Sequence, residues 1–391
     1  MSVEVRPLGV KCNIRCTYCY QNPQREALVD RHRYDLNAIK NAVQKTGGPF
    51  TLFGGEPLLV PIEDLENLWS WGLERYGRNA IQTNGSLIND RHIELFKRCR
   101  VSVGISVDGP GELNDLRSAG TLENTRRATE RTHAAIARLC AEGVTPSLIA
   151  TLHRRNATAE RIPVFLDWLE RLDSLGIRSV GLHLLEIDNE TVRQHTLSLE
   201  ENISALSKIL ELEPRLRNLR FPLFNAMRRL LQGDDAKASC VWKSCDPYTT
   251  RAVQGIEGHG ERSNCGRTNK DGIDFVKGSL PGFERYLMLY QTPQDVGGCR
   301  GCRFFSMCKG QCPGTAIDGD WRNRTEYCEV WKALFIRFEN ELLKKKKWVL
   351  SRSRHRRVVE EGLLNEWKLG RSGSLTKLVS SVRDAEPKAL V

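Results

Sequence analysis

Short apolar runs alternate with amphipathic segments over the first half of the chain. Strand-like runs lie at Val3–Leu8, Phe50–Phe53, Ala80–Thr83, Val101–Val107, Thr145–Leu152 and Ser179–Leu185. Helical patterns separate them at Asp35–Thr46, Ile62–Tyr76, Asp90–Cys99, Thr121–Glu142 and Ala159–Leu175, and continue at Glu200–Glu213 and Leu223–Leu231. Repeated β–α alternation joins parallel strands by right-handed crossovers. The pattern therefore predicts an α/β fold built from six such units.

Segments rich in glycine or polar residues follow four of these strands. They are a cysteine loop, Phe53-Gly54-Gly55-Glu56-Pro57, Thr83-Asn84-Gly85 and Ser106-Val107-Asp108-Gly109-Pro110. In parallel α/β barrels the chemistry lies at the carboxyl ends of the strands. Each segment occupies such an end, so we expect one shared site there.

The cysteine loop contains Cys12, Cys16 and Cys19 in a C-x3-C-x2-C pattern, with Tyr18 before the last cysteine. Three thiolates can hold three irons of a 4Fe–4S cube and leave the fourth iron open, whereas common ferredoxin patterns supply a fourth cysteine. The alternative is a zinc site, because C-x2-C is a common half-site for zinc. That reading needs a fourth ligand, and the nearest candidate is His32.

This loop, with Gly-Gly-Glu-Pro beginning 35 residues after Cys19, resembles the signature of the radical S-adenosylmethionine (SAM) superfamily. The resemblance implies a partial, open (β/α)6 barrel, a 4Fe–4S cluster and bound SAM. It implies that Gly54, Gly55 and Glu56 contact the SAM amino group, largely through the backbone, with Glu56 as an acceptor for the ammonium. It also implies that Ser106 helps to bind SAM, and that an arginine on the helix after strand four pairs with the SAM carboxylate. Arg127 and Arg131 are in range, and we prefer Arg131.

A second cysteine array begins after Gly233-Asp-Asp-Ala-Lys237. Its members are Cys240, Cys245, Cys265, Cys299, Cys302, Cys308, Cys312 and Cys328. The spacings closely resemble the seven-cysteine SPASM extension, which carries two auxiliary 4Fe–4S clusters. By position, the resemblance assigns Cys245, Cys265 and Cys312 to the first auxiliary cluster, and Cys299, Cys302, Cys308 and Cys328 to the second.

Cys240 is an additional cysteine, which we predict to be the fourth ligand of the first auxiliary cluster. If it is not, that iron could bind a substrate thiolate. Cys99 and Cys140 lie in helical patterns, where free cysteines behave as small buried hydrophobes.

Composition narrows the class of protein. The chain has 391 residues, 40% of them hydrophobic, and no apolar run near the length of a membrane span. Thirteen cysteines without a secretory leader indicate metal or redox chemistry in a reducing compartment, so we expect a cytoplasmic protein. The expected divisions are a radical SAM core over 1–232, an auxiliary-cluster domain over 233–335, and a C-terminal helix and basic tail over 336–391.

The net charge of +11 is concentrated at the C-terminal end. Residues 344–391 contain 13 Lys and Arg against 5 Asp and Glu, a net charge of +8. We expect a solvated, partly disordered basic tail. Capture of an acidic peptide or of RNA is the alternative use of this charge. RNA is disfavoured because no RNA-recognition motif is present.

The predicted function is that of a radical SAM oxidoreductase with auxiliary clusters. Its 5′-deoxyadenosyl radical would take a hydrogen from the substrate, and auxiliary clusters imply a net oxidation. Relatives of this type mostly modify peptides, so we predict oxidative modification, by cross-linking, of a ribosomally made peptide or protein. The alternatives are oxidation of a small molecule such as an amino-sugar alcohol, formylglycine formation, or a non-catalytic role, including RNA binding by the tail, with structural clusters. Formylglycine is disfavoured because Gly266 replaces the aspartate base of that branch.

The expected partners follow from this chemistry. They are a peptide or small-protein substrate and an external electron donor such as flavodoxin or ferredoxin. Only eleven residues precede Cys12, so leader recognition is expected to use a separate leader-peptide-binding protein, the barrel rim or the tail.

Overall fold

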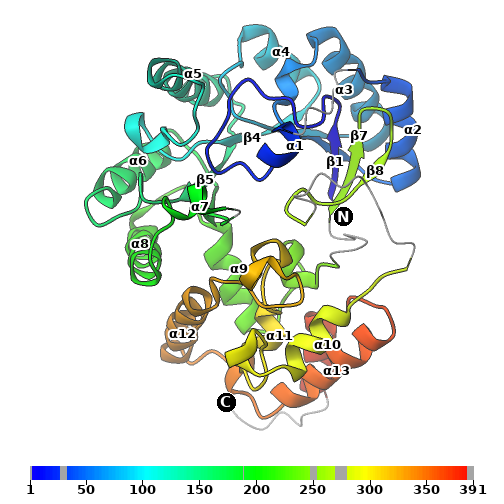
Figure 1. Ribbon diagram of the computed structural model, residues 1–391, viewed down its shortest axis with the longest axis vertical. Helices are drawn as coiled ribbons and strands as arrows, with labels where there is room; N and C mark the ends of the chain where they lie inside the picture. The colour runs from blue at the N-terminus through cyan, green and yellow to red at the C-terminus, as the bar shows by residue number, and fades with distance from the viewer. Residues whose placement is uncertain (1, 27–32, 188, 247–252, 269–279, 385–391) are drawn as a thin grey trace. The chain divides into compact units, whose positions relative to one another are not determined.

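The computed structural model describes residues 2–26, 33–187, 189–246, 253–268 and 280–384 (Figure 1). These residues form two compact units. The first contains residues 1–222 and 253–275, and the second contains residues 223–252 and 276–391. Residues 253–275, which the sequence analysis grouped with the cysteine-rich segment, thus join the first unit.

The first unit is an α/β partial barrel, as the alternation of apolar runs predicts. Its parallel strands are β1 (Ser2–Arg6), β2 (Phe50–Leu52), β3 (Asn79–Thr83), β4 (Val101–Ser106), β5 (Ser147–Leu152) and β6 (Val180–Leu184). The helices after these strands are α2 (Leu36–Thr46), α3 (Ile62–Tyr76), α4 (Asp90–Arg98), α5 (Leu122–Ala141), α6 (Ile162–Ser174) and α8 (Leu199–Leu212), arranged around the sheet (Figure 1).

Two strands extend the sheet beyond the prediction. The strand order is β6-β5-β4-β3-β2-β1-β7-β8. β7 (Val253–Glu257) pairs in parallel with β1, and β8 (Arg262–Ser263) pairs antiparallel with β7. β1 is therefore an interior strand, with Val5 opposite Leu52 on one side and Ile256 on the other, and all three side chains are fully buried.

Caps set the helix boundaries of this unit. The Asp35 carboxylate accepts hydrogen bonds from the first turn of α2, and Asn89, Thr121 and Ser198 do the same for α4, α5 and α8. Short connections then place the carboxyl ends of β1 to β6 along one edge of the sheet. The cysteine loop and α1 (Asn22–Glu26) follow β1 at that edge.

The second unit is mainly helical. Its helices are α9 (Pro222–Leu231, of which Pro222 belongs to the first unit), α10 (Glu284–Gln291), α11 (Phe305–Cys308), α12 (Cys328–Lys344), α13 (Arg356–Lys368) and α14 (Leu375–Asp384). Aromatic rings form its core. Phe304 stacks on Phe335 with ring centroids 5.3 Å apart, and Tyr286 stacks on Trp367 at 5.0 Å.

The expectation of a partly disordered basic tail is wrong for residues 344–384. α13 packs against α10, α11 and α14, and buries Val359, Leu363 and Trp367. Apolar residues at helical spacing inside a charged segment supply the buried side of the helix. Part of the positive charge is paired within the unit, as in the ion pair between Arg352 and Glu339 at 3.1 Å. The four lysines at 344–347 remain exposed.

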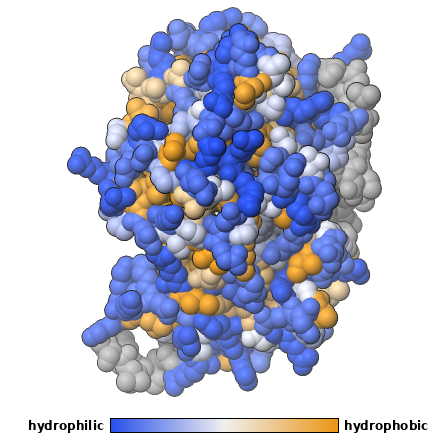
Figure 2. Space-filling model, turned by 60° about the vertical axis from the view of Figure 1, so that its left-hand side comes forward, coloured by the Kyte–Doolittle hydropathy of each residue, from blue (hydrophilic) through white to orange (hydrophobic). Residues whose placement is uncertain are grey.

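Hydrophilic residues predominate on the molecular face in Figure 2, where hydrophobic residues form separate patches. Among the helices in the described ranges, none is both long and apolar enough to cross a membrane.

Candidate active site

Cys12, Cys16 and Cys19 lie on one tight loop at the carboxyl end of β1. The Cys19 amide donates to the Cys16 carbonyl at 3.1 Å, and the Thr17 amide donates to the Leu116 carbonyl at 2.8 Å. Burial, together with the nearby thiols, raises the pKa of Cys12 above its usual value and that of Cys16 to about 12. The structure thus brings the three predicted thiols together, which is what a shared metal cluster requires.

Gly54 and Gly55 lie directly against this loop. The Gly55 amide donates to the Gly9 carbonyl at 3.0 Å, and the Glu56 amide donates to the Lys11 carbonyl at 2.8 Å. A Cβ atom on Gly55 would lie 2.0 Å from the Lys11 carbonyl oxygen, far inside normal contact. Glycine is therefore required for the close approach of the two backbone segments.

Glu56 has a different setting from the one predicted. Its carboxylate is 1% exposed and accepts from the Leu58 amide at 3.0 Å, the Asn84 amide at 2.8 Å and the Thr83 hydroxyl at 2.6 Å. Burial raises the pKa of Glu56, although these three donors oppose the rise. The carboxylate joins the ends of β2 and β3 and does not line the cavity described next, so its side chain is not placed to accept from an ammonium there.

A cavity of about 190 Å³ opens beside the cysteine loop. Its wall includes the three cysteines, Gly54, Gly55, and Ser106 at the end of β4. Arg127 and Arg131 are exposed on α5 and are not part of the wall. Arg117 is on the wall instead, eleven residues after Ser106.

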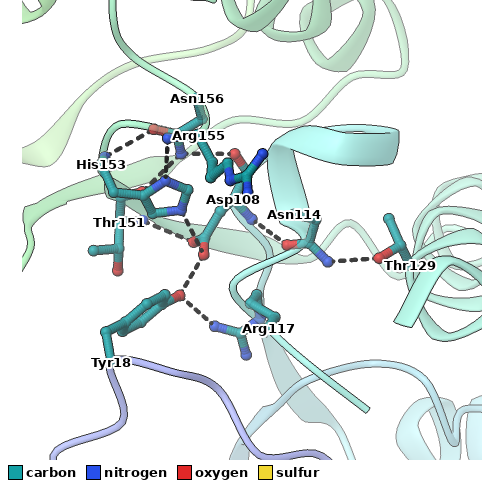
Figure 3. A network of polar contacts seen from close by, with 9 residues as sticks. All are labelled: Tyr18, Asp108, Asn114, Arg117, Thr129, Thr151, His153, Arg155 and Asn156. Carbon is teal, nitrogen blue, oxygen red and sulfur yellow. Dashed lines mark hydrogen bonds and ion pairs between the residues drawn. The ribbon is translucent and has the colours of Figure 1, made fainter. Parts of the chain in front are cut away.

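A buried polar network supports Arg117 (Figure 3). Its guanidinium donates to the Tyr18 hydroxyl at 3.1 Å, and the Tyr18 hydroxyl donates to Asp108. The Asp108 carboxylate also accepts from the Thr151 amide at 2.9 Å and lies 3.4 Å from His153 Nε2. Burial alone would raise the pKa of Asp108, but the His153 hydrogen bond and the Arg117 charge hold it below its usual value. The aspartate therefore stays ionised and balances Arg117.

Sequence reasoning assigned no role to Arg117, Tyr18 or Asp108. Tyr18 and Asp108 lie within motifs that the sequence analysis quoted, so a signal was present for both. Arg117 follows β4 by a loop and a short 3₁₀ helix (Gly111–Asn114). No periodicity marks its side chain as buried, because loop side chains are oriented by tertiary contacts.

The cavity wall also carries a second polar group. Arg267 donates to His183 Nδ1 at 2.9 Å and lies 2.8 Å from the Glu186 carboxylate. Burial and the Arg267 charge lower the pKa of His183 to about 3, so its imidazole is neutral at physiological pH. With Nδ1 accepting, the ring hydrogen is on Nε2.

Gly266 precedes this arginine and packs against Tyr20. A Cβ atom at Gly266 would lie 2.3 Å from the Tyr20 ring. An aspartate at this position would therefore displace the ring.

In the second unit, Cys299, Cys302, Cys308 and Cys328 lie near one another. Burial raises the pKa of Cys308 well above its usual value, and the other three thiols add to that rise by charge repulsion. Cys245 and Cys312 both lie close enough to Tyr286 to raise the pKa of its hydroxyl, which burial raises most. Cys240 begins a 3₁₀ helix, Cys240–Lys243. Cys265 belongs to the first unit.

Two predictions concern other candidate ligands. Within the ranges that the structure describes, no three His, Cys, Asp or Glu side chains are grouped as a site for a single metal ion. His32, the candidate fourth zinc ligand, lies outside those ranges. Cys99 is buried and Cys140 partly buried on their helices, as their patterns predict.

Residues 7–156 match the family model described as the radical SAM superfamily. This stretch holds the cysteine loop, the Gly54–Gly55 turn, Ser106 and the Asp108 network. Over residues 7–156 the chain is therefore similar to the radical SAM superfamily.

Curated relatives include several anaerobic sulfatase-maturating enzymes. The serine-type anaerobic enzyme of Bacteroides thetaiotaomicron is 32% identical over 128 residues, 29% of this chain and 30% of its own length. The cysteine-type anaerobic enzyme of Clostridium perfringens strain 13 is 26% identical over 148 residues, 33% of this chain and 40% of its own. The chain thus spans less than half of each of these relatives.

Solved structures share the fold over most of the chain. A structure of anSMEcpe with bound AdoMet and the Cp18Cys peptide covers 88% of this chain and 98% of its own, with a TM-score of 0.65 and 18% identity. Streptococcus suis SuiB bound to S-adenosylmethionine covers 84% and 76%, with a TM-score of 0.56 and 17% identity. At these identities the likeness establishes the fold, which includes the C-terminal cysteine-rich region.

Proposed function

We propose that the chain is a radical SAM oxidoreductase that modifies a peptide by net oxidation. The observation that carries the proposal is the cavity in which Cys12, Cys16 and Cys19 meet the Gly54–Gly55 backbone and Ser106. Three thiols on a loop of this spacing fit a 4Fe–4S cluster with one open iron. When cluster and SAM are bound, they supply the 5′-deoxyadenosyl radical that removes a hydrogen atom from the substrate.

The chain's own residues would bind and orient SAM. The backbone at Gly54 and Gly55 can approach the amino group closely, and Ser106 lines the same cavity. We propose Arg117, rather than Arg131, as the partner of the carboxylate, because its fork-shaped guanidinium lies on the cavity wall and is oriented by a hydrogen bond to Tyr18.

Two auxiliary 4Fe–4S clusters would accept the electron that net oxidation releases. The mutual influence of Cys299, Cys302, Cys308 and Cys328 fits one four-thiolate site. For the other, we retain Cys245, Cys265 and Cys312 with Cys240 as the fourth ligand. The proximity of Cys245 and Cys312 to Tyr286 supports the pairing of these two.

A peptide is the proposed substrate because the solved relatives include peptide complexes: anSMEcpe with the Cp18Cys peptide, and SuiB with the precursor peptide SuiA. Cross-linking is favoured over formylglycine formation, since Gly266 has no side chain and Tyr20 occupies the space that one would need. Oxidation of a small molecule is the second candidate. The electron donor would be a flavodoxin or ferredoxin, with a separate protein to bind a leader peptide.

Iron content tests the cluster assignment. Anaerobically reconstituted protein should hold about twelve irons, four in each of three clusters. Replacing Cys12, Cys16 and Cys19 together by Ala should remove one third of the iron and all SAM cleavage. Cys140→Ala is the matched control and should retain every iron, because this thiol lies on α5 and belongs to neither cysteine array. Zinc with little iron in the freshly isolated protein would overturn the proposal.

Product analysis tests the reaction. Incubation with a candidate peptide should yield 5′-deoxyadenosine and a peptide that has lost two hydrogen atoms. Cys302→Ala should lower the ratio of modified peptide to 5′-deoxyadenosine, because electron removal fails while radical formation continues. An unchanged ratio, in a variant that has lost one auxiliary cluster, would exclude the electron-accepting role.

A further inference from the structure

Two cationic side chains are buried in the second unit among the cysteines. Arg285 and Lys309 are each 1% exposed. Arg285 is on α10, and Lys309 follows Cys308 in the left-handed region of backbone conformation, with φ of 53°. Lys309 lies between the predicted ligands Cys308 and Cys312, but neither cation is itself a predicted ligand, and the proposed function gives them no role.

Their hydrogen-bond partners are neutral. Arg285 donates to four backbone carbonyls, those of Trp321 at 2.6 Å, Asn323 at 2.9 Å, and Lys309 and Gly310 at 3.3 Å. The Lys309 ammonium donates to the Trp242 carbonyl at 2.6 Å. Among the residues that the structure describes, neither cation has a carboxylate within ion-pair distance.

Such charges are costly in a folded protein. A buried ion without an opposite charge carries a desolvation penalty of several kcal/mol, so buried charges are normally paired. Carbonyl dipoles reduce the penalty without supplying an opposite charge. The buried Asp235 carboxylate, beyond ion-pair distance, compensates part of the Lys309 charge. A further opposite charge is therefore expected nearby.

The positions of the two cations indicate its source. Lys309 adjoins Cys308, and its ammonium reaches the 3₁₀ helix Cys240–Lys243. Arg285 is close enough to Cys299 for its charge to lower the pKa of that thiol, which burial and neighbouring thiols raise overall. The next residue, Tyr286, donates to the Cys245 carbonyl at 2.5 Å. Both cations thus lie beside the thiols assigned to the second auxiliary site, and each is connected to the segment that holds Cys240 and Cys245.

We infer that Lys309 and Arg285 are positioning residues that supply the counter-charge of the auxiliary clusters and favour their reduced state. This inference rests on the proposed function, because it requires the two clusters. A four-thiolate 4Fe–4S centre is anionic and gains a further negative charge on reduction. A buried cation at short range stabilises the more negative state, because screening by water is weak there. The clusters would then accept the substrate's electron more readily.

The charge of Lys309 is the simplest to remove. Lys309→Met deletes it, Lys309→Gln deletes it but can still donate to the Trp242 carbonyl, and Lys309→Arg retains it. The control is Lys344→Met, which removes an exposed cation from the same unit, where solvent screens its charge. Midpoint potentials of the reconstituted full chain would be measured by redox titration with paramagnetic resonance detection, together with iron content.

We expect the neutral variants to be harder to reduce. At a fixed potential, the ratio of oxidised to reduced cluster should rise about tenfold, which corresponds to a midpoint potential lower by about 59 mV for one electron. Lys309→Arg and Lys344→Met should leave the midpoint potential unchanged. If the neutral variants lose iron and Lys309→Arg does not, the counter-charge role is also supported. Full iron with unchanged potential would overturn it, and so would equal iron loss in all three Lys309 variants. Absence of auxiliary-cluster signals from the wild-type protein would instead refute the proposed function.

Discussion

Replacing Glu56 by Gln tests whether this residue holds the site together or binds the SAM ammonium. In the structure, one carboxylate oxygen accepts from the Leu58 amide and the Thr83 hydroxyl, and the other accepts from the Asn84 amide. A glutamine presents one acceptor and one donor. In either orientation the glutamine NH2 group faces a backbone N–H, that of Leu58 or of Asn84, and the two donors repel each other.

The size of the effect follows from these contacts. A hydrogen bond to a charged acceptor contributes about 1.5–3 kcal/mol, and a buried donor without a partner costs about 1–3 kcal/mol. The neutral amide is easier to bury than the carboxylate, which offsets part of this loss. We therefore expect Glu56→Gln to lower the unfolding free energy of the first unit by about 2–4 kcal/mol. For a unit of this size each kcal/mol corresponds to about 2–4 °C in Tm.

Anaerobic thermal unfolding and SAM binding would be measured together. We expect a lower Tm, with weaker SAM binding as a consequence of the displaced Thr83–Gly85 turn. Glu63→Gln is the control, because Glu63 is exposed at the start of α3 and pairs with the exposed Arg91. A normal Tm combined with a large loss of SAM affinity would refute this reasoning and restore Glu56 as a ligand of the ammonium.

Two further predictions concern the second unit and the His183 group. Trp367→Ala should destabilise the second unit by about 3–5 kcal/mol and reduce its iron content, because the indole is 2% exposed, stacks on Tyr286 and donates to Ser244 at 3.0 Å. Leu369→Ala, at an exposed position, is the control. An unchanged Tm of Trp367→Ala would show that the C-terminal helices do not support the cluster region. The pKa of His183 is lowered to about 3 in the folded protein, against about 6.5 in the unfolded chain. Its contribution to stability is therefore fully present above pH 6.5, where the imidazole is neutral in both states. The contribution is lost as pH falls from 6.5 toward 3, because only the unfolded chain binds the proton. His183→Asn should therefore flatten the fall of Tm between pH 7 and 5, by at most about 1.4 kcal/mol per pH unit and by less because the ring is partly exposed; identical slopes in the two proteins would contradict the low pKa.

The sequence by itself determined the main elements of the first unit and the grouping of the three thiols on one loop. Strands of alternating or continuous apolar residues and capped amphipathic helices are local patterns, and α3 runs over the predicted residues Ile62–Tyr76. The cysteine spacing is also local, because three thiols within eight residues can meet without help from the rest of the fold. The two glycines at 54 and 55 were readable for the same reason, since only glycine allows the approach to the Cys12 loop.

Only the tertiary structure decided which charged side chains face the cavity. Arg131 and Arg117 both follow β4, but packing exposes the first on α5 and holds the second against Tyr18. Glu56 was recognisable by its motif, yet its partners Thr83 and Asn84 come from the next strand. The pairing of β7 with β1 and the packing of α13 are likewise long-range contacts. Local sequence patterns determine which face of a helix or strand is buried. The element that packs on that face is determined by contacts between residues far apart in the sequence.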